Sequence, residues 1–144
     1  MKLRGSKGAR PPLAPRNRLV REIQAVLDLI RPHGDVVPAY NGYCGAATEA
    51  YLHLARESGE ADGLRVMRRS SDHGSHWWLL DSAGRVIDLN LSSADRQRLK
   101  IHPRATYPYE EGKGGAFQAN PGPSKRAAAI IELVKSRRKS AAST

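Results

Sequence analysis

The chain has one cysteine, one phenylalanine and only 6% aromatic residues in a length of 144. A single cysteine excludes an internal disulfide, and in a reducing compartment a lone thiol is either a packed small side chain or a reactive group. No apolar run approaches the roughly 18 residues needed to cross a bilayer, so we expect no membrane-spanning helix. The basic start of the chain leads into prolines rather than an apolar segment, so we expect no export signal and a cytoplasmic location.

Acidic residues are also scarce, which leaves a formal net charge of +10. The basic residues crowd the two ends of the chain: Lys2, Arg4, Lys7, Arg10, Arg16, Arg18 and Arg21 near the start, and Lys125, Arg126, Lys135, Arg137, Arg138 and Lys139 near the end. Such ends can contact nucleic acid without sequence specificity, through phosphates and with strong salt dependence. They can equally be solvated ends that keep the chain soluble.

Length and composition predict a single domain at residues 16–137, between a disordered basic arm at 1–15 and a basic tail at 138–144. Apolar residues at three- and four-residue spacing predict a helix over 17–30, which Pro32 ends. A second helix rich in good helix formers is expected to begin at Cys44 and to end near Gly59.

Beyond the second helix the pattern changes to alternation and turns. The expected elements are strands over 64–68, 76–80 and 85–91, a hairpin turn over 81–84, a short helix over 92–99, an irregular loop over 102–123, and an amphipathic helix capped by Ser124 and running through Val134. The predicted class is α+β, with the cysteine-bearing helix packed on a small antiparallel sheet and helices flanking both ends of the domain.

The position of Cys44 is one at which a cysteine can be reactive. The unpaired N–H groups and the dipole at a helix N-terminus favour an anion, and therefore a thiolate. The alternative is that Cys44 packs tightly where the helix meets the sheet, and Gly45 after it permits close approach in either case. Position and residue type alone do not decide between the two.

His76 and Asp88 supply the other chemistry-bearing side chains. His76 begins a strand after a polar loop, while Asp88 lies in an otherwise apolar strand, where a carboxylate needs a partner. A hairpin tip near 82–83 makes the two residues direct cross-strand neighbours with side chains on one face. The carboxylate would then orient the imidazole so that its other nitrogen reaches the sulfur of Cys44.

This order of residues resembles the transglutaminase-like branch of papain-like cysteine enzymes, a core that arylamine acetyltransferases share. The resemblance covers about residues 36–91, and its matching pieces are Asn41-Gly42-Tyr43-Cys44, Ser75-His76-Trp77-Trp78-Leu79-Leu80 and Gly84-Arg85-Val86-Ile87-Asp88-Leu89-Asn90. The chain is also similar to short uncharacterised proteins of bacteriophages and their hosts, which end in a segment like 123–126. For a phage-encoded protein the compartment would be the host cytoplasm.

The resemblance implies a papain-like fold and a thioester intermediate, with Cys44 as nucleophile, His76 as base and then acid, and Asp88 as its orienter. The substrate would be a protein or peptide-like amide, used for hydrolysis (protease, amidase or deamidase) or for transfer to an amine, without cofactor or metal. For the oxyanion, Asn41 is the nearest side-chain candidate, and backbone N–H groups at Cys44 and Gly45 are the alternative.

Trp77 and Trp78 alternate along one strand, so we expect at most one of them to line a substrate cleft. The segment 107–117 is expected to be either a glycine-hinged lid over that cleft or an ordinary surface crossover. Of the remaining histidines, His53 is half a helical turn out of phase with Cys44, and His33 and His102 lie in turns beside proline.

Three other interpretations compete with the triad. His73 could replace His76, but it lacks the cross-strand carboxylate. Cys44 with His73, His76 and Asp88 offers ligand types that zinc accepts, but no pair has the usual ligand spacing. In another class of function, the chain would be a basic nucleic-acid-associated protein that keeps the papain-like core as a non-catalytic scaffold. No nucleic-acid-recognition motif supports specific readout.

Overall fold

The computed structural model describes residues 12–30, 43–71, 74–91, 109, 112–115 and 123–142. Its elements are α1 (Arg18–Ile30), α2 (Cys44–Glu57), β1 (Arg65–Ser71), β2 (Gly74–Leu80), β3 (Val86–Ile87), β4 (Lys113–Gly114) and α4 (Lys125–Ala142). Over these residues the fold is α+β, with three helices and a four-stranded antiparallel sheet in the order β3-β2-β1-β4. The predicted class is confirmed.

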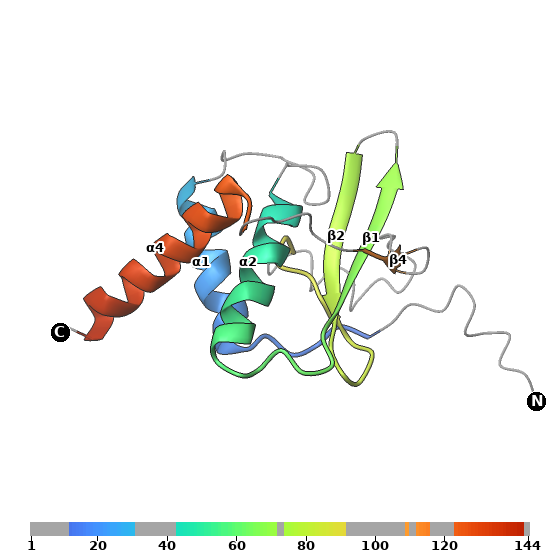
Figure 1. Ribbon diagram of the computed structural model, residues 1–144, viewed down its shortest axis with the longest axis horizontal. Coiled ribbons are helices and arrows are strands. Elements are labelled where there is room, and N and C mark those ends of the chain that lie inside the picture. The colour runs from blue at the N-terminus through green and yellow to red at the C-terminus, as the bar shows by residue number, and fades with distance from the viewer. Residues whose placement is uncertain are drawn as a thin grey trace, which may run out of the picture.

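Helix α2 is the central layer, between the helices α1 and α4 on one side and the sheet on the other (Figure 1). It is buried nearly all round, and its alanines, among them Ala47, Ala50 and Ala55, let the neighbouring elements approach closely. Leu79 of β2 shares one apolar core with all three helices. A helix buried on both faces is held firmly, so the position of Cys44 at its first residue is well fixed.

The flanking helices begin where the sequence predicts. The N–H of Val20 donates to Asn17 Oδ1 at 2.8 Å, which caps α1, and the N–H of Ala127 donates to Ser124 Oγ at 3.3 Å, which caps α4. Ser124 Oγ also donates to Glu49 Oε1 of α2 at 2.9 Å, so the start of α4 is tied to the central helix.

The far end of α4 differs from the prediction, because residues 138–142, expected as part of a basic tail, are helical as far as Ala142. Arg138 explains this, since its guanidinium donates to both oxygens of Glu22 on α1 at 2.8 and 2.7 Å. A bidentate pair of this kind joins the last turns of α4 to α1. The apolar periodicity of the last helix therefore underestimated its length.

The boundary of the basic arm was also wrong. Residues 12–15, expected to be disordered, run beside β3: the N–H of Ala14 donates to Val86 O, and the N–H of Val86 donates to Pro12 O, both at 2.8 Å. Leu13 forms a parallel bridge with Val86, and Ala14 is buried. The segment satisfies backbone groups that β3 would otherwise expose at the edge of the sheet. Residues 1–11 lie outside the described ranges.

The hairpin turn over 81–84 is confirmed, with the N–H of Asp81 donating to Arg85 O at 2.9 Å. The strand after it is much shorter than the expected 85–91, because β3 pairs with β2 only at Leu79↔Ile87 and Leu80↔Val86. Continued in this register, the ladder would place Trp78 opposite Asp88. The expectation that His76 and Asp88 are direct cross-strand neighbours was therefore wrong by two residues.

The remaining expectations concern either a strand that was not predicted or residues outside the described ranges. The strand β4 lies within the segment expected to lack regular structure and pairs with β1 at Met67↔Gly114 and Arg68↔Lys113. The expected short helix over 92–99 lies outside the described residues, as do Asn41, His33, His73 and His102. None of the helices in the described part of the chain is long and apolar enough to cross a membrane.

Candidate active site

His76 and Asp88 form a buried ion pair past the end of the β2–β3 ladder. The Nε2–H of His76 donates to Asp88 Oδ2 at 2.6 Å, and each residue is only 1% exposed. Asp88 can reach the ring because the chain leaves the ladder after Ile87 and turns, with the N–H of Leu91 donating to Asp88 O at 3.4 Å. On the same face of a sheet, diagonal neighbours are still within reach.

The carboxylate of Asp88 has two further donors. The N–H of Asn90 donates to Oδ1 at 2.9 Å, and the phenol of Tyr109 donates to Oδ2 at 2.7 Å. Burial raises the pKa of Asp88, but the charge and hydrogen bond of His76, together with the bonds from Tyr109 and Asn90, lower it, and the net direction is down. Asp88 is therefore ionised at neutral pH, and its hydrogen bonds offset the cost of burying it.

The imidazole of His76 is held in its charged form. Burial lowers its pKa, but this effect is outweighed by the charge and hydrogen bond of Asp88 and then by the contact with Cys44. The pKa therefore rises from 6.5 to about 10. Trp78 stacks on the ring, with centroids 5.5 Å apart and planes inclined by 29°. A stacked aromatic ring also attracts an imidazolium cation.

Cys44 is the third member of the group. As the first residue of α2 it is 4% exposed, and its side chain interacts with the His76 ring. Because Nε2 of His76 is bound to Asp88, the side of the ring that remains for the Cys44 thiol is the one that carries Nδ1. Nδ1 itself is buried and has no partner of good hydrogen-bond geometry. Catalytic hydrogen bonds are often loose without substrate and tighten when it binds.

The two tryptophans of β2 point to opposite faces, as predicted, yet each touches the site. A Cβ added at Gly45 would lie 3.1 Å from Trp77 Cδ1, so the indole of Trp77 lies directly against the residue after Cys44. Trp78 lies on the other face with His76, and Tyr109 packs edge-on against it at 5.2 Å. Trp77 therefore borders Cys44, and Trp78 covers the ion pair.

The backbone at the start of α2 is the part of the predicted oxyanion site that the structure describes. Tyr43 is the residue before the helix, and it makes no side-chain hydrogen bond that caps the first turn. The first N–H groups of a helix have no acceptor within it, which is why the backbone of Cys44 and Gly45 remains the candidate for an oxyanion site. Asn41, the side-chain candidate, lies outside the described residues.

Tyr109 is the site residue that sequence reasoning missed. It was placed in a loop or lid segment, and nothing near it in sequence indicates a buried carboxylate 21 residues earlier. Tyr109 is 4% exposed. Two glycines of the same segment lie against the tryptophans: a Cβ at Gly112 would overlap the ring of Trp78, and one at Gly115 would lie 3.0 Å from Trp77. The described part of this segment therefore covers both tryptophans.

The other candidates lie elsewhere. His53 bonds to Glu57 Oε2 at 3.0 Å on the exposed part of α2, as its helical phase predicts. Within the described ranges, no three His, Cys, Asp or Glu side chains gather as a metal site would require, and His73 is outside those ranges. Two cavities of about 330 and 550 Å³ lie mainly along α1 and α4, away from the three residues.

Comparison of the chain with protein-family models, with curated proteins and with solved structures finds no match. The functional assignment therefore depends on the chemistry of Cys44, His76 and Asp88. Three different elements bring these side chains together: the start of α2, strand β2 and the turn after β3.

Proposed function

We propose that the protein is a cysteine-nucleophile acyl-transfer enzyme of the papain-like or transglutaminase-like type. The observation that carries the proposal is the buried series Cys44–His76–Asp88, in which a carboxylate holds an imidazole beside a thiol at a helix N-terminus. A nucleophile, a base within its reach and a third group that orients the base are the usual signature of covalent catalysis.

A purely structural role explains this arrangement less well. A buried ion pair is weak evidence for stability, because apolar residues of similar volume often stabilise a core as much or more. Here the pair is buried under Trp78 and Tyr109 and is supported by three hydrogen bonds to Asp88. Perturbed pKa values of this kind gather at functional sites.

The first half of the reaction forms the thioester. The reaction starts from the Cys44 thiolate beside the charged His76 imidazolium, whose Nδ1 holds the former thiol proton. The sulfur attacks the substrate carbonyl carbon, whose π electrons move to oxygen. The N–H groups of Cys44 and Gly45 stabilise that oxyanion. As the carbonyl re-forms, the bond to the leaving group breaks and the His76 imidazolium gives its proton to the departing amine.

The second half reverses these steps with a new nucleophile. His76, now neutral, takes a proton from water or from an amine as that molecule attacks the thioester. The C–S bond then breaks, which releases the acyl product and restores the Cys44 thiolate beside the His76 imidazolium. Water would give a protease, amidase or deamidase, and an amine a transglutaminase-like transferase. Because Cys44 is 4% exposed, a neighbouring segment must move before a substrate can reach it.

The alternative, a nucleic-acid-associated protein acting through its basic ends, has less support from the described contacts. Arg138 is bound to Glu22, and Lys135 Nζ lies 3.0 Å from Glu57 Oε1. These two cations of the C-terminal basic stretch are therefore already engaged with carboxylates of α1 and α2, and neither is freely presented to phosphates.

The proposal predicts an acyl-enzyme. Incubation with p-nitrophenyl acetate should release a burst of nitrophenolate, with one acetyl group on Cys44 by peptide mass spectrometry. Cys44→Ala should abolish the burst, and His76→Ala should slow it by about 100-fold or more, the usual size of general-base catalysis. His53→Ala, a histidine on the same helix as Cys44 but away from the site, is the matched control and should keep the burst.

An excess of glycinamide then separates the two chemistries. Faster loss of the acetyl group with the amine than in water alone indicates a transferase, and equal loss indicates a hydrolase. Absence of the burst in the wild type, or acetylation only at lysines, would contradict the proposed activity.

A further inference from the structure

Thr48 is a fully buried threonine in the first turns of α2, the helix that Cys44 begins. Its hydroxyl oxygen Oγ1 lies 2.7 Å from Cys44 O and 3.3 Å from Trp77 O of β2. A hydroxyl has one hydrogen to donate, so Thr48 donates mainly to the nearer carbonyl and shares the hydrogen with the farther one. One side chain thus contacts both the first residue of α2 and the residue directly after His76.

The first of these two bonds is ordinary, and the second is not. A threonine hydroxyl in a helix often bonds to the carbonyl four residues earlier, and this slightly destabilises the helix. The carbonyl of Trp77, however, belongs to a different element. Alanine is a better helix former than threonine and occupies the neighbouring buried positions Ala46, Ala47 and Ala50. A buried threonine among them therefore indicates that its hydroxyl has a role at the contact with β2.

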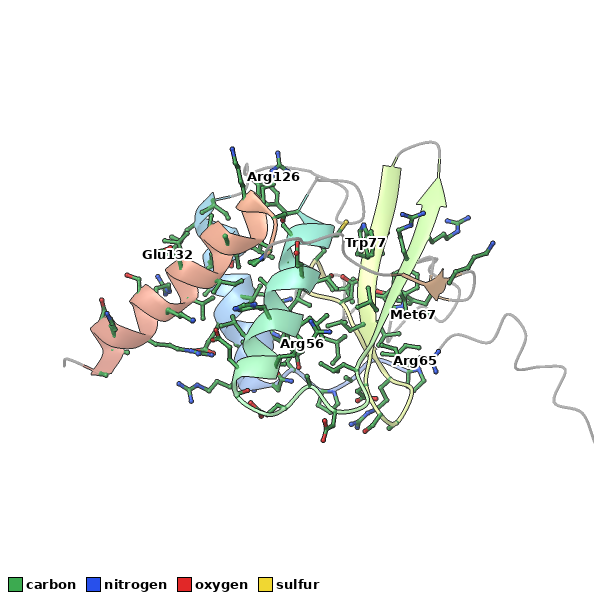
Figure 2. The ribbon with its side chains drawn as sticks, in the orientation of Figure 1. Arg56, Arg65, Met67, Trp77, Arg126 and Glu132 are labelled. Carbon is green, nitrogen blue, oxygen red and sulfur yellow. The ribbon has the colours of Figure 1, made fainter. Side chains whose placement is uncertain are left out.

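Trp77 meets the same face of α2 at a second point. Gly45 and Thr48 are three residues apart, so they lie on one face of the helix. A Cβ added at Gly45 would lie 3.1 Å from Trp77 Cδ1, which shows that the indole packs directly on the helix backbone there. Figure 2 shows Trp77 of β2 at the end of α2 where the helix begins. The ring and the carbonyl of Trp77 therefore join the first turns of α2 to β2.

This joint lies one residue away from two members of the triad. Cys44 directly precedes Gly45 on the helix, and His76 directly precedes Trp77 on the strand. A shift of α2 along or away from β2 would change the separation of the sulfur and the imidazole. Catalysis depends on such separations, because a misplacement of about 1 Å can lower a rate by about 100-fold.

We propose that Thr48 is a positioning residue for acyl transfer: its hydroxyl holds the start of α2 against β2 and so sets the geometry between Cys44 and His76. This inference rests on the proposed acyl-transfer function. The hydroxyl contacts two backbone carbonyls, so Thr48 acts through the position of Cys44 and His76 and is not itself a catalytic residue.

Thr48→Val tests the role of the hydroxyl, because it replaces that group with a methyl of similar size. The nitrophenolate burst from p-nitrophenyl acetate should slow by about tenfold to 100-fold, and alkylation of Cys44 by iodoacetamide at neutral pH should slow with it. Thr48→Ser restores a hydroxyl and should keep both rates close to the wild-type values, because serine has the same single donor.

The His76→Gln background separates a positioning role from a general change in access to Cys44. If Thr48 acts through the geometry between Cys44 and His76, Thr48→Val should have almost no further effect once His76 is replaced, because the residues act as a unit. A change in access would alter the iodoacetamide rate by the same factor in both backgrounds.

Ser58→Ala is the matched control, because it removes a hydroxyl from the opposite end of the same helix. Ser58 Oγ lies 3.2 Å from Ala55 O and 2.6 Å from Glu60 Oε1. This variant should keep the wild-type burst and alkylation rate. Circular dichroism shows which variants are folded. If Thr48→Val is not folded, Thr48→Ala takes its place in the same comparison, since it removes the hydroxyl without placing a methyl against the two carbonyls.

The outcomes separate this inference from the function on which it rests. Wild-type rates in the variant without the hydroxyl, equal losses in Thr48→Ser, or the same factor in the His76→Gln background would each overturn the positioning role. If the wild type still shows its burst, the acyl-transfer proposal stands in all three cases. A wild type without a burst, whose alkylation is slow and independent of His76, would overturn the acyl-transfer proposal itself.

Discussion

Asp88→Asn is expected to lower the free energy of unfolding by about 3–5 kcal/mol, because it leaves the buried cation of His76 without its counter-charge. Urea denaturation followed by tryptophan fluorescence measures the change. Tyr109→Phe provides the scale, since it removes one hydrogen bond from the same carboxylate oxygen and should cost only about 1 kcal/mol. Equal stability of Asp88→Asn and the wild type would contradict the ion pair described here.

The same pair makes the stability of the wild type depend on pH in a defined direction. The pKa of His76 is raised from 6.5 to about 10, so its contribution is fully present below pH 6.5 and is lost as the pH rises towards 10. The pKa of Asp88 is lowered from 3.8, so its contribution is present above pH 3.8 and is lost as the pH falls through the lower folded value. Between pH 6.5 and pH 10 the free energy of unfolding of the wild type should fall by on the order of 1 kcal/mol per pH unit, and Asp88→Asn should lack this slope.

Gly112→Ala is expected to destabilise the cover of the site, by about 1–3 kcal/mol for an overpacked core position. The added Cβ would overlap the six-membered ring of Trp78, lying 2.6 Å from its Cη2, and the indole is fully buried. The N–H of Gly112 also bonds to Tyr109 O at 3.3 Å, so moving Gly112 should disturb the bond from Tyr109 to Asp88.

Gly114→Ala is the matched control for this substitution. Gly114 is two residues away in β4, and a Cβ there meets nothing within 4 Å. Urea denaturation should show the loss only in Gly112→Ala, together with a change in the fluorescence of the tryptophans. Equal stability of the two variants would mean that the segment 112–115 does not pack on Trp78 as described.

Local patterns predicted the helices because the signals for a helix are local. The apolar spacing over 17–30 and the cap at Ser124 are each contained within a few residues. The length of α4 depended instead on Arg138 and Glu22, which are 116 residues apart, and no periodicity within α4 could reveal that pair. The pairing of residues 12–15 with Val86 is non-local in the same way.

The predictions for the site divide in the same way, into local features that were found and non-local contacts that were missed. The sequence was sufficient to place Cys44 at a helix start and to pair His76 with Asp88, because an unpartnered carboxylate in an apolar strand demands a cation. The register between β2 and β3 was missed because the turn decides it. Asp81 accepts hydrogen bonds from Ala83 and Arg85, and Gly84 adopts a φ of 78°. This turn sets the strand pairing two residues away from the expected one. Tyr109 was missed because no local signal marks its contact with Asp88.

The most direct test of the account is the rate at which iodoacetamide alkylates Cys44 as a function of pH, in the wild type, His76→Ala, His76→Gln and His53→Ala. Circular dichroism shows which variants are folded, and the glutamine variant keeps volume and a donor next to Asp88. The account predicts that Cys44 reacts at neutral pH faster than a free thiol in solution, that both His76 variants lose this reactivity, and that His53→Ala retains it. A rate profile that matches an ordinary thiol and is the same in all four proteins would contradict it.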